Sequence, residues 1–268
     1  MLNLWCKKTK VLLVGTGNAF ILARQFRYYG IDAHVLLPSR LFLNPFHYKG
    51  LDVVYGVYLM DFCGSFLAVK LLRKKYVIHV IGSDAFRYER ARSGLERTRK
   101  RLWDLILSQS EEVFFVTREL KETMGFKKGK IIPIPVDTKI FKKQEYTGEK
   151  RDILYYCPDP RVFRLKWILD YAKKHPNETV TIVGYKGTVN MPNVEIIPSA
   201  PYDKMPLLYA KHRRLIRMTI HDGYPKMPYE ALLCGLDVVW NCQKITRVPP
   251  EMLMENTTPK VISILRKI

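Results

Sequence analysis

The sequence lacks any apolar run long enough to cross a bilayer, because basic residues between Lys7 and Arg27 interrupt the amino-terminal candidate. It also shows no secretory leader pattern. Its five cysteines are odd in number, widely spaced and without a C-x-x-C pair, which favours reduced core thiols over disulfides. We therefore expect a cytoplasmic protein.

Metal-binding patterns are missing as well. No Asp-x-Asp occurs, and the six histidines are scattered along the chain. Clustered ligands are what a bound metal ion requires. We therefore expect no metal site and no cofactor.

Acidic residues are scarce relative to basic ones. Twenty-five Asp and Glu residues stand against 45 Lys and Arg, a formal net charge of +20, and the excess is larger in the first half of the chain. Such a charge attracts polyanions: nucleic acid, anionic lipid headgroups or phosphorylated substrates.

What is present indicates a packed α/β protein. Apolar residues make up 47% and aromatics 12% of the 268 residues, enough for two modest cores. Short buried strands alternate with amphipathic helices, which predicts parallel sheets. A polar stretch at 142–151 reads as a linker. We expect two Rossmann-like domains, residues 1–145 and 146–268, with the terminal helix free to cross back to the first.

The segment 213–241 contains the strongest candidates for functional residues. It predicts a strand, a helix that begins near Pro225 and Pro228, and a second strand. Asp222 then lies in the turn before the helix and Glu230 in its first turn. Both carboxylates are expected at the carboxyl edge of a sheet, where open α/β sheets bind ligands. The same residues also fit a structural role, as a turn and as a partner of the helix dipole.

A glycine turn follows the first predicted strand. Gly15, Gly17 and Asn18 join that strand to a helix in a phosphate-approach pattern. The third glycine of G-x-G-x-x-G is absent, which disfavours a nicotinamide cofactor. The turn either contacts a ligand or only allows a tight reversal of the chain.

The stretch from Asp222 to Gly235 resembles the E-x7-E segment of retaining family four glycosyltransferases. Asp222 stands for the first Glu of that segment, and Gly223, Tyr224, Glu230 and Gly235 match it. The resemblance implies the GT-B fold, with two parallel sheets facing an interdomain cleft. It also implies transfer of a sugar from a nucleotide-diphosphate-sugar to an acceptor held mainly by the amino-terminal domain.

The resemblance also implies roles for particular residues. Glu230 would accept hydrogen bonds from the donor ribose, and Asp222 from sugar hydroxyls. Arg161 and Lys166, with Lys226, would neutralise the departing diphosphate in place of a metal ion. The neighbouring substrate contacts are Gly223, Tyr224, Pro225, Lys226 and Met227.

Three further segments resemble parts of the same family. Residues 133–141 are similar to the end of its amino-terminal domain. Gly82, Ser83 and Asp84 are similar to a loop that lines the cleft, and His79 precedes them inside an apolar strand. His79 is interpreted either as an acceptor contact or as a core residue. Gly184 is expected to let the backbone approach the donor base or ribose.

A run of arginines and lysines between residues 86 and 103 recurs at helical spacing. We interpret this basic helix as an attachment to an anionic membrane surface or to a polyprenyl-phosphate-linked acceptor, which would make the protein peripheral on the cytoplasmic face. A solvated face with ion pairs to Glu89 and Glu96 is the alternative.

Three other functions stay open. A GT-B epimerase would release a sugar without an acceptor. A nucleic-acid-binding protein would explain the charge, but the sequence has neither a helix-turn-helix nor an aromatic-basic platform, so nucleic acid is not the expected partner. A degenerate, non-enzymatic GT-B protein would explain the departures from the motif.

Overall fold

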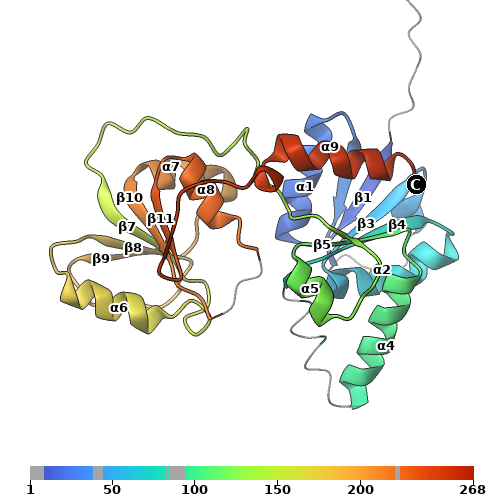
Figure 1. Ribbon diagram of the computed structural model, residues 1–268, viewed down its shortest axis with the longest axis horizontal. Coiled ribbons are helices and arrows are strands. Elements are labelled where there is room, and N and C mark those ends of the chain that lie inside the picture. The colour runs from blue at the N-terminus through green and yellow to red at the C-terminus, as the bar shows by residue number, and fades with distance from the viewer. Residues whose placement is uncertain (1–8, 39–44, 83, 85–87, 89–93, 221–223) are drawn as a thin grey trace, which may run out of the picture. The chain divides into compact units, whose positions relative to one another are not determined.

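The computed structural model describes residues 9–38, 45–82, 84, 88, 94–220 and 224–268. The chain divides into two compact units: unit 1 is Met1–Pro135 with Met254–Ile268, and unit 2 is Val136–Leu253 (Figure 1). Both units are parallel-sheet α/β structures, as the sequence predicts.

Unit 1 contains a six-stranded parallel sheet in the order β2-β1-β3-β4-β5-β6. Its strands are β1 (Lys10–Val14), β2 (Asp32–Leu36), β3 (Val53–Val57), β4 (Lys75–Val80), β5 (Glu112–Phe115) and β6 (Lys130–Ile131). Its helices are α1 (Gly17–Tyr28), η2 (Pro45–Tyr48), α2 (Leu59–Leu71), α4 (Gly94–Ser108), α5 (Arg118–Thr123) and α9 (Met254–Leu265). Figure 1 shows α1 and α9 on one face of the sheet and α2, α4 and α5 on the other.

Unit 2 contains a second six-stranded sheet in the order β12-β11-β10-β7-β8-β9, parallel except for β12. Its strands are β7 (Arg151–Tyr156), β8 (Val180–Val183), β9 (Val194–Ile197), β10 (His212–Arg217), β11 (Asp237–Trp240) and β12 (Gln243–Ile245). Its helices are α6 (Leu165–Lys174), η3 (Tyr202–Lys204), α7 (Met205–Ala210), α8 (Met227–Leu233) and η4 (Pro250–Met252). Helices α7 and α8 cover one face and α6 the other, each over its own apolar core.

The boundary between the units lies between Pro135 and Val136, whereas the sequence led us to expect it between residues 145 and 146. The Val136 N–H donates to the Met252 carbonyl at 2.7 Å, and Ile140 and Phe141 are buried in the core of unit 2. Helix α9 belongs to unit 1, where the Thr258 hydroxyl donates to Oε1 of buried Gln25 at 3.1 Å. Residues 136–145 therefore belong to unit 2, and the last helix packs with unit 1.

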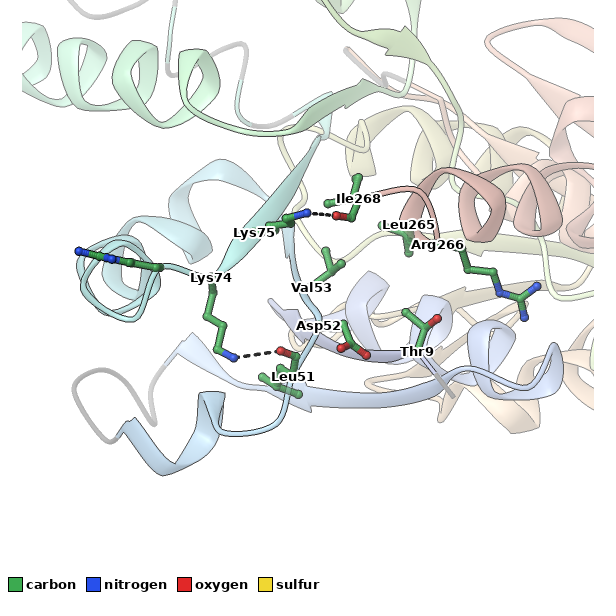
Figure 2. A pocket seen from close by; sticks show the side chains of 10 residues that line it. Thr9, Leu51, Asp52, Val53, Lys74, Lys75, Leu265, Arg266 and Ile268 are labelled. Carbon is green, nitrogen blue, oxygen red and sulfur yellow. Dashed lines mark hydrogen bonds between the residues drawn. The ribbon is translucent and has the colours of Figure 1, made fainter. Parts of the chain in front are cut away.

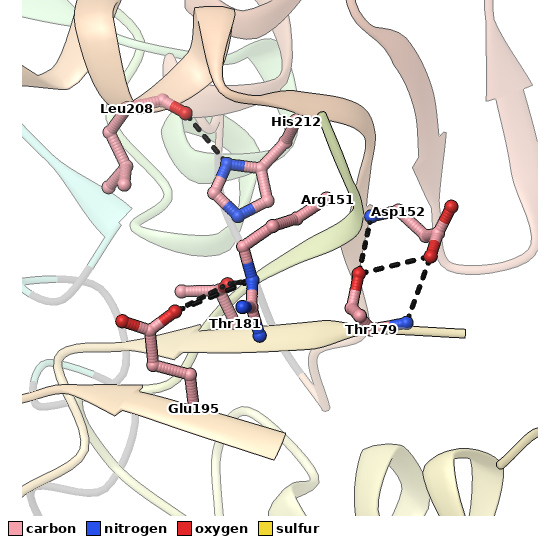
Figure 3. Close-up of polar contacts among 7 residues, drawn as sticks. All are labelled: Arg151, Asp152, Thr179, Thr181, Glu195, Leu208 and His212. Atoms are coloured by element: carbon pink, nitrogen blue, oxygen red, sulfur yellow. Dashed lines mark hydrogen bonds and ion pairs between the residues drawn. The ribbon is translucent and has the colours of Figure 1, made fainter. Parts of the chain in front are cut away.

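A polar network ties the amino ends of the strands of unit 2 together (Figure 3). Asp152 and Thr179 exchange backbone and side-chain hydrogen bonds of 2.9–3.0 Å, which join the starts of β7 and β8. The Arg151 Nε donates to the Thr181 hydroxyl at 2.8 Å and lies 3.4 Å from Glu195 Oε2. The starts of β7, β8 and β9 are therefore held together by side chains.

Candidate functional site

The carboxyl edge of unit 2 has a topological switch point between β7 and β10. From β7 the chain moves outward to β8 and β9, and then returns to add β10 and β11 on the other side. The loops after β7 and β10 therefore leave the sheet in opposite directions, and such a crevice binds ligands in open α/β sheets. One bond joins the two loops, from the Ile220 N–H to the Val162 carbonyl at 2.9 Å.

Glu230 lies buried beside this edge, in the middle of α8, with 5% of its surface exposed. The Tyr202 hydroxyl donates to its Oε1 at 3.3 Å and the Tyr209 hydroxyl to its Oε2 at 3.4 Å. Burial raises the pKa of Glu230, while Lys226, the two hydroxyls and Arg217 oppose that rise. A buried carboxylate is costly unless it has such partners.

Lys226 immediately precedes α8 and is half-buried. Its ammonium lies 5.7 Å from the centre of the Tyr202 ring. Burial lowers the pKa of Lys226, and the carboxylates of Glu230 and Asp137 oppose that shift. The structure thus brings the predicted carboxylate and one predicted cation together at the start of α8.

Arg217, at the end of β10, is a cation that the sequence analysis did not single out. It is 6% exposed, and its guanidinium carbon lies 4.9 Å from the centre of the Phe163 ring and 5.5 Å from that of Tyr156. Its Nη1 donates to the Met227 sulfur at 3.6 Å. The aromatic rings hold this charge in a fixed orientation at the switch point.

Trp240, at the end of β11, is paired in register with Arg217. Its indole nitrogen is buried and has no hydrogen-bond partner within the part of the chain that the structure describes. Buried donors of this kind are rare in native proteins and call for an explanation. Its place in the register puts it at the same edge as Arg217.

Arg161 and Lys166, the two cations predicted to neutralise the diphosphate, are both exposed. Arg161 lies in the loop after β7, where its N–H donates to Asp159 Oδ1 at 2.8 Å. Lys166 lies in the first turn of α6 and forms an ion pair with Asp170 at 2.8 Å, with 88% of its side chain exposed. The structure therefore places Arg161 on a switch-point loop and gives Lys166 a surface partner.

The remaining predicted contacts of unit 2 flank the same edge. Gly184 follows β8 with φ +91°, and an added Cβ would lie 3.3 Å from the Pro158 backbone nitrogen. The Tyr224 hydroxyl donates to Glu251 Oε1 at 3.3 Å, and Pro225 is buried. Asp222 and Gly223 lie outside the described residues, so their predicted roles stay predictions.

Unit 1 has its own switch point, between β1 and β3, and the predicted glycine turn lies there. Asp61 Oδ2 accepts from the Thr16 N–H at 3.2 Å and from its hydroxyl at 3.4 Å. The Asn18 amide donates to the Tyr58 hydroxyl at 2.9 Å. The glycine turn is thus bonded to the start of α2 through Asp61 and Tyr58, which were not predicted from the sequence.

His79 is 1% exposed and lies near the carboxyl end of β4. Its Nε2 lies 2.8 Å from the Ile132 carbonyl and must donate to it, so Nδ1 accepts from the Tyr55 hydroxyl, also at 2.8 Å. Burial lowers the pKa of His79 to about 4. Both ring nitrogens are occupied, which supports the core interpretation over an acceptor contact.

Asp84 is also 1% exposed, and it holds the amino end of α2. Its Oδ2 accepts from the Leu59 N–H at 3.0 Å and from the Ile81 N–H at 3.3 Å. Burial raises the pKa of Asp84 to about 6. Gly82 lies half-buried between these bonds, and Ser83 lies outside the described residues.

No family model and no curated protein matches the sequence. Solved structures do match. The sucrose-phosphate synthase from Thermosynechococcus elongatus has a TM-score of 0.63 over 87% of this chain and 81% of that chain, at 11% identity. HepE from Anabaena, in complex with UDP-glucose, has a TM-score of 0.64 over 87% and 80%, at 12% identity.

A third match is an alpha-glucosyltransferase in complex with UDP and a 13-mer DNA, with a TM-score of 0.59 over 87% of this chain and 80% of that chain, at 10% identity. These neighbours are GT-B glycosyltransferases. The chain therefore has the GT-B fold.

Proposed function

We propose that the protein is a retaining glycosyltransferase that takes its sugar from a nucleotide-diphosphate-sugar. The observation that carries the proposal is the grouping of buried Glu230 with Lys226 and Arg217 at the switch point of unit 2. The fold it shares with enzymes crystallised with UDP and UDP-glucose supports the same donor class.

In this proposal Glu230 accepts hydrogen bonds from the donor ribose, exchanging its weak bonds to the two tyrosines for stronger ones. Arg217, Lys226 and Arg161 stabilise the negative charge that grows on the leaving diphosphate. The unpaired indole N–H of Trp240 supplies one further donor to the ligand. Asp222 keeps its predicted role toward sugar hydroxyls.

The proposed reaction is a front-face displacement without a metal ion. The acceptor hydroxyl oxygen bonds to the anomeric carbon while the bond from that carbon to the diphosphate breaks. The acceptor proton passes to the leaving phosphate oxygen. The configuration at the anomeric carbon is therefore retained, as the resemblance to family four implies.

A screen of nucleoside diphosphates by thermal shift tests the donor class, because a ligand specific to the folded state raises its melting temperature. The corresponding nucleotide-sugars are then incubated with the protein, and the products are identified by NMR. Release or transfer of a sugar with retained configuration supports the proposal. Inversion of the anomeric carbon would exclude it, and an epimerised free sugar would indicate an epimerase.

We propose a lipid-linked acceptor bound by unit 1. A second candidate is DNA, because one structural neighbour was crystallised with it and this chain carries a net charge of +20. Radiolabelled donor sugar separates the two acceptors: it would enter either an organic-extractable fraction or a nuclease-sensitive one.

A further inference from the structure

An unusual number of large apolar side chains are exposed on two helices of unit 1. Among the described residues, six of the twelve exposed large hydrophobic side chains are leucines of α2 and α4 or of the residue directly after α2. They are Leu67, Leu71, Leu72, Leu95, Leu102 and Leu105, here called the leucine face. Leu71 is 70% exposed and Leu95 73%. Apolar groups gathered in this way mark an interaction surface.

Helices α2 and α4, which carry most of these leucines, pack against each other. The Trp103 indole N–H donates to the Cys63 sulfur at 3.1 Å, which joins α4 to α2. Trp103, Ile106 and Leu107 turn the other side of α4 into the core. Residues 95, 102 and 105 are seven and three positions apart and share one flank of α4. The leucine face is therefore not needed for packing within unit 1.

Cations accompany the leucines. Arg97 and Arg101 are exposed along the outer side of α4, and Lys70 and Arg73 are exposed at the end of α2. An apolar stripe bordered by positive charges is typical of helices that lie in the interface of an anionic membrane. Duplex DNA would use the cations only, because its phosphate backbone gains nothing from exposed leucines.

A hollow of about 490 Å³ lies next to the end of α2 (Figure 2). Its lining includes Arg73, Lys74, Lys75 and Arg266. Lys74 Nζ donates to the Leu51 carbonyl at 3.0 Å, and Lys75 Nζ donates to the Ile268 main-chain oxygen. The side chains of Arg73 and Arg266 form no hydrogen bond or ion pair within the described residues. Two guanidinium groups are thus left to meet a phosphate.

We infer that unit 1 docks on an anionic phospholipid surface, with the leucine face inserted among the acyl chains and Arg73 and Arg266 meeting headgroup phosphates. The exposed cations favour an anionic partner, and the exposed leucines favour a lipid surface over other polyanions. The inference goes beyond the proposed function, because docking needs no turnover.

Co-sedimentation of the full chain with vesicles tests the inference. We expect binding to vesicles of phosphatidylcholine mixed with phosphatidylglycerol, and at least about tenfold weaker binding to phosphatidylcholine alone. A variant carrying Leu71→Gln, Leu102→Gln and Leu105→Gln should lose about tenfold in affinity with an unchanged melting temperature. Leu207→Gln, an exposed leucine of unit 2, is the matched control and should bind like wild type.

Headgroup and electrostatic contributions are separated by two further measurements. Arg73→Gln with Arg266→Gln should weaken vesicle binding, and soluble glycerol phosphate should compete poorly, because it lacks the acyl chains. Equal binding by the triple leucine variant would overturn the inference. So would tight, salt-sensitive DNA binding without any vesicle binding, which would assign the cations to nucleic acid.

The catalytic proposal and the docking inference fail independently. Glu230→Gln should lose donor turnover and still bind anionic vesicles. Loss of vesicle binding in the leucine variant with full turnover of a soluble acceptor analogue would support docking alone.

Discussion

Two buried groups of unit 1, Asp84 and His79, respond to pH in opposite directions. The pKa of Asp84 is raised to about 6 from 3.8, so its contribution to stability is full below pH 3.8 and is lost as pH rises through about 6. The pKa of His79 is lowered to about 4 from 6.5, so its contribution is present above pH 6.5 and is lost as pH falls toward about 4. The two effects oppose each other over the same range.

Asp84→Asn should expose the contribution of His79. Asparagine keeps a carbonyl oxygen for the Leu59 and Ile81 N–H groups but no longer titrates. We expect the free energy of unfolding of the variant to rise from pH 4 to 6.5 by up to about 3 kcal/mol more than that of the wild type. Urea unfolding at a series of pH values measures this.

The substitution itself is controlled by Asp203→Asn, at an exposed aspartate of unit 2. Curves for Asp84→Asn and wild type that run parallel from pH 4 to 6.5 would contradict the assigned burial of Asp84.

At the scale of single elements, the turn between β1 and α1 depends on one of its two glycines. An added Cβ at Gly15, whose φ is +152°, would lie 2.5 Å from the Val57 carbonyl oxygen, which is backbone and cannot move away freely. At Gly17, the first residue of α1, an added Cβ meets nothing within 4 Å. The close approach of Val57 therefore requires a glycine at position 15, whereas no contact requires one at position 17.

Gly15→Ala should lower the free energy of unfolding by about 1–3 kcal/mol, from backbone strain and close contact. Gly17→Ala should stay within about 0.5 kcal/mol of wild type, since alanine is tolerated at a helix start. Thermal or urea unfolding of the two variants in parallel checks this. Similar stabilities for both variants would show that Val57 does not constrain the turn.

The helices and strands could be predicted from the sequence because they depend on the local spacing of apolar residues and on the prolines and glycines at their ends. The second strand predicted within residues 213–241 is β11. The helix predicted to begin near Pro225 and Pro228 is α8, which ends before Gly235, whose φ of +90° suits glycine. The boundary between the units could not be predicted, because it depends on the long-range bond from Val136 to Met252. The local sequence pattern does not indicate hydrogen bonds between residues that lie far apart in the chain.

The grouping of Glu230 with Lys226 could be predicted because both residues lie in one short segment, whereas the position of Arg217 depends on packing; the roles of all three residues in a site stay predictions. Glu230 lies in α8, four positions after Lys226, the residue that caps the start of this helix. Arg217 looks like one more basic residue in a strand that already contains Arg213 and Arg214, and only the fold places its guanidinium over Phe163 and Tyr156. Its position directly after the apolar pair Leu215 and Ile216, at the end of the strand, was the signal that could have identified it.

At the scale of the whole molecule, the net charge of +20 is shared between two tasks in this account. We propose that cations of unit 2, of which Arg217 is buried and Lys226 half-buried, bind a diphosphate, and that exposed cations of unit 1 bind a lipid surface. The first set is shielded from salt and the second is not. Raising the ionic strength should therefore release the protein from vesicles at salt concentrations that leave nucleotide binding largely intact.

The most direct test of the central claim is the affinity for UDP, or for the nucleoside diphosphate selected by the screen, measured by calorimetry on three proteins. Wild type and Glu149→Gln, which changes an exposed glutamate of unit 2, should bind equally. Glu230→Gln should bind about 10–150-fold more weakly, the loss expected when hydrogen bonds to a charged group are removed. Wild-type affinity in Glu230→Gln, with an intact melting transition, would contradict the placement of the donor at this edge of unit 2.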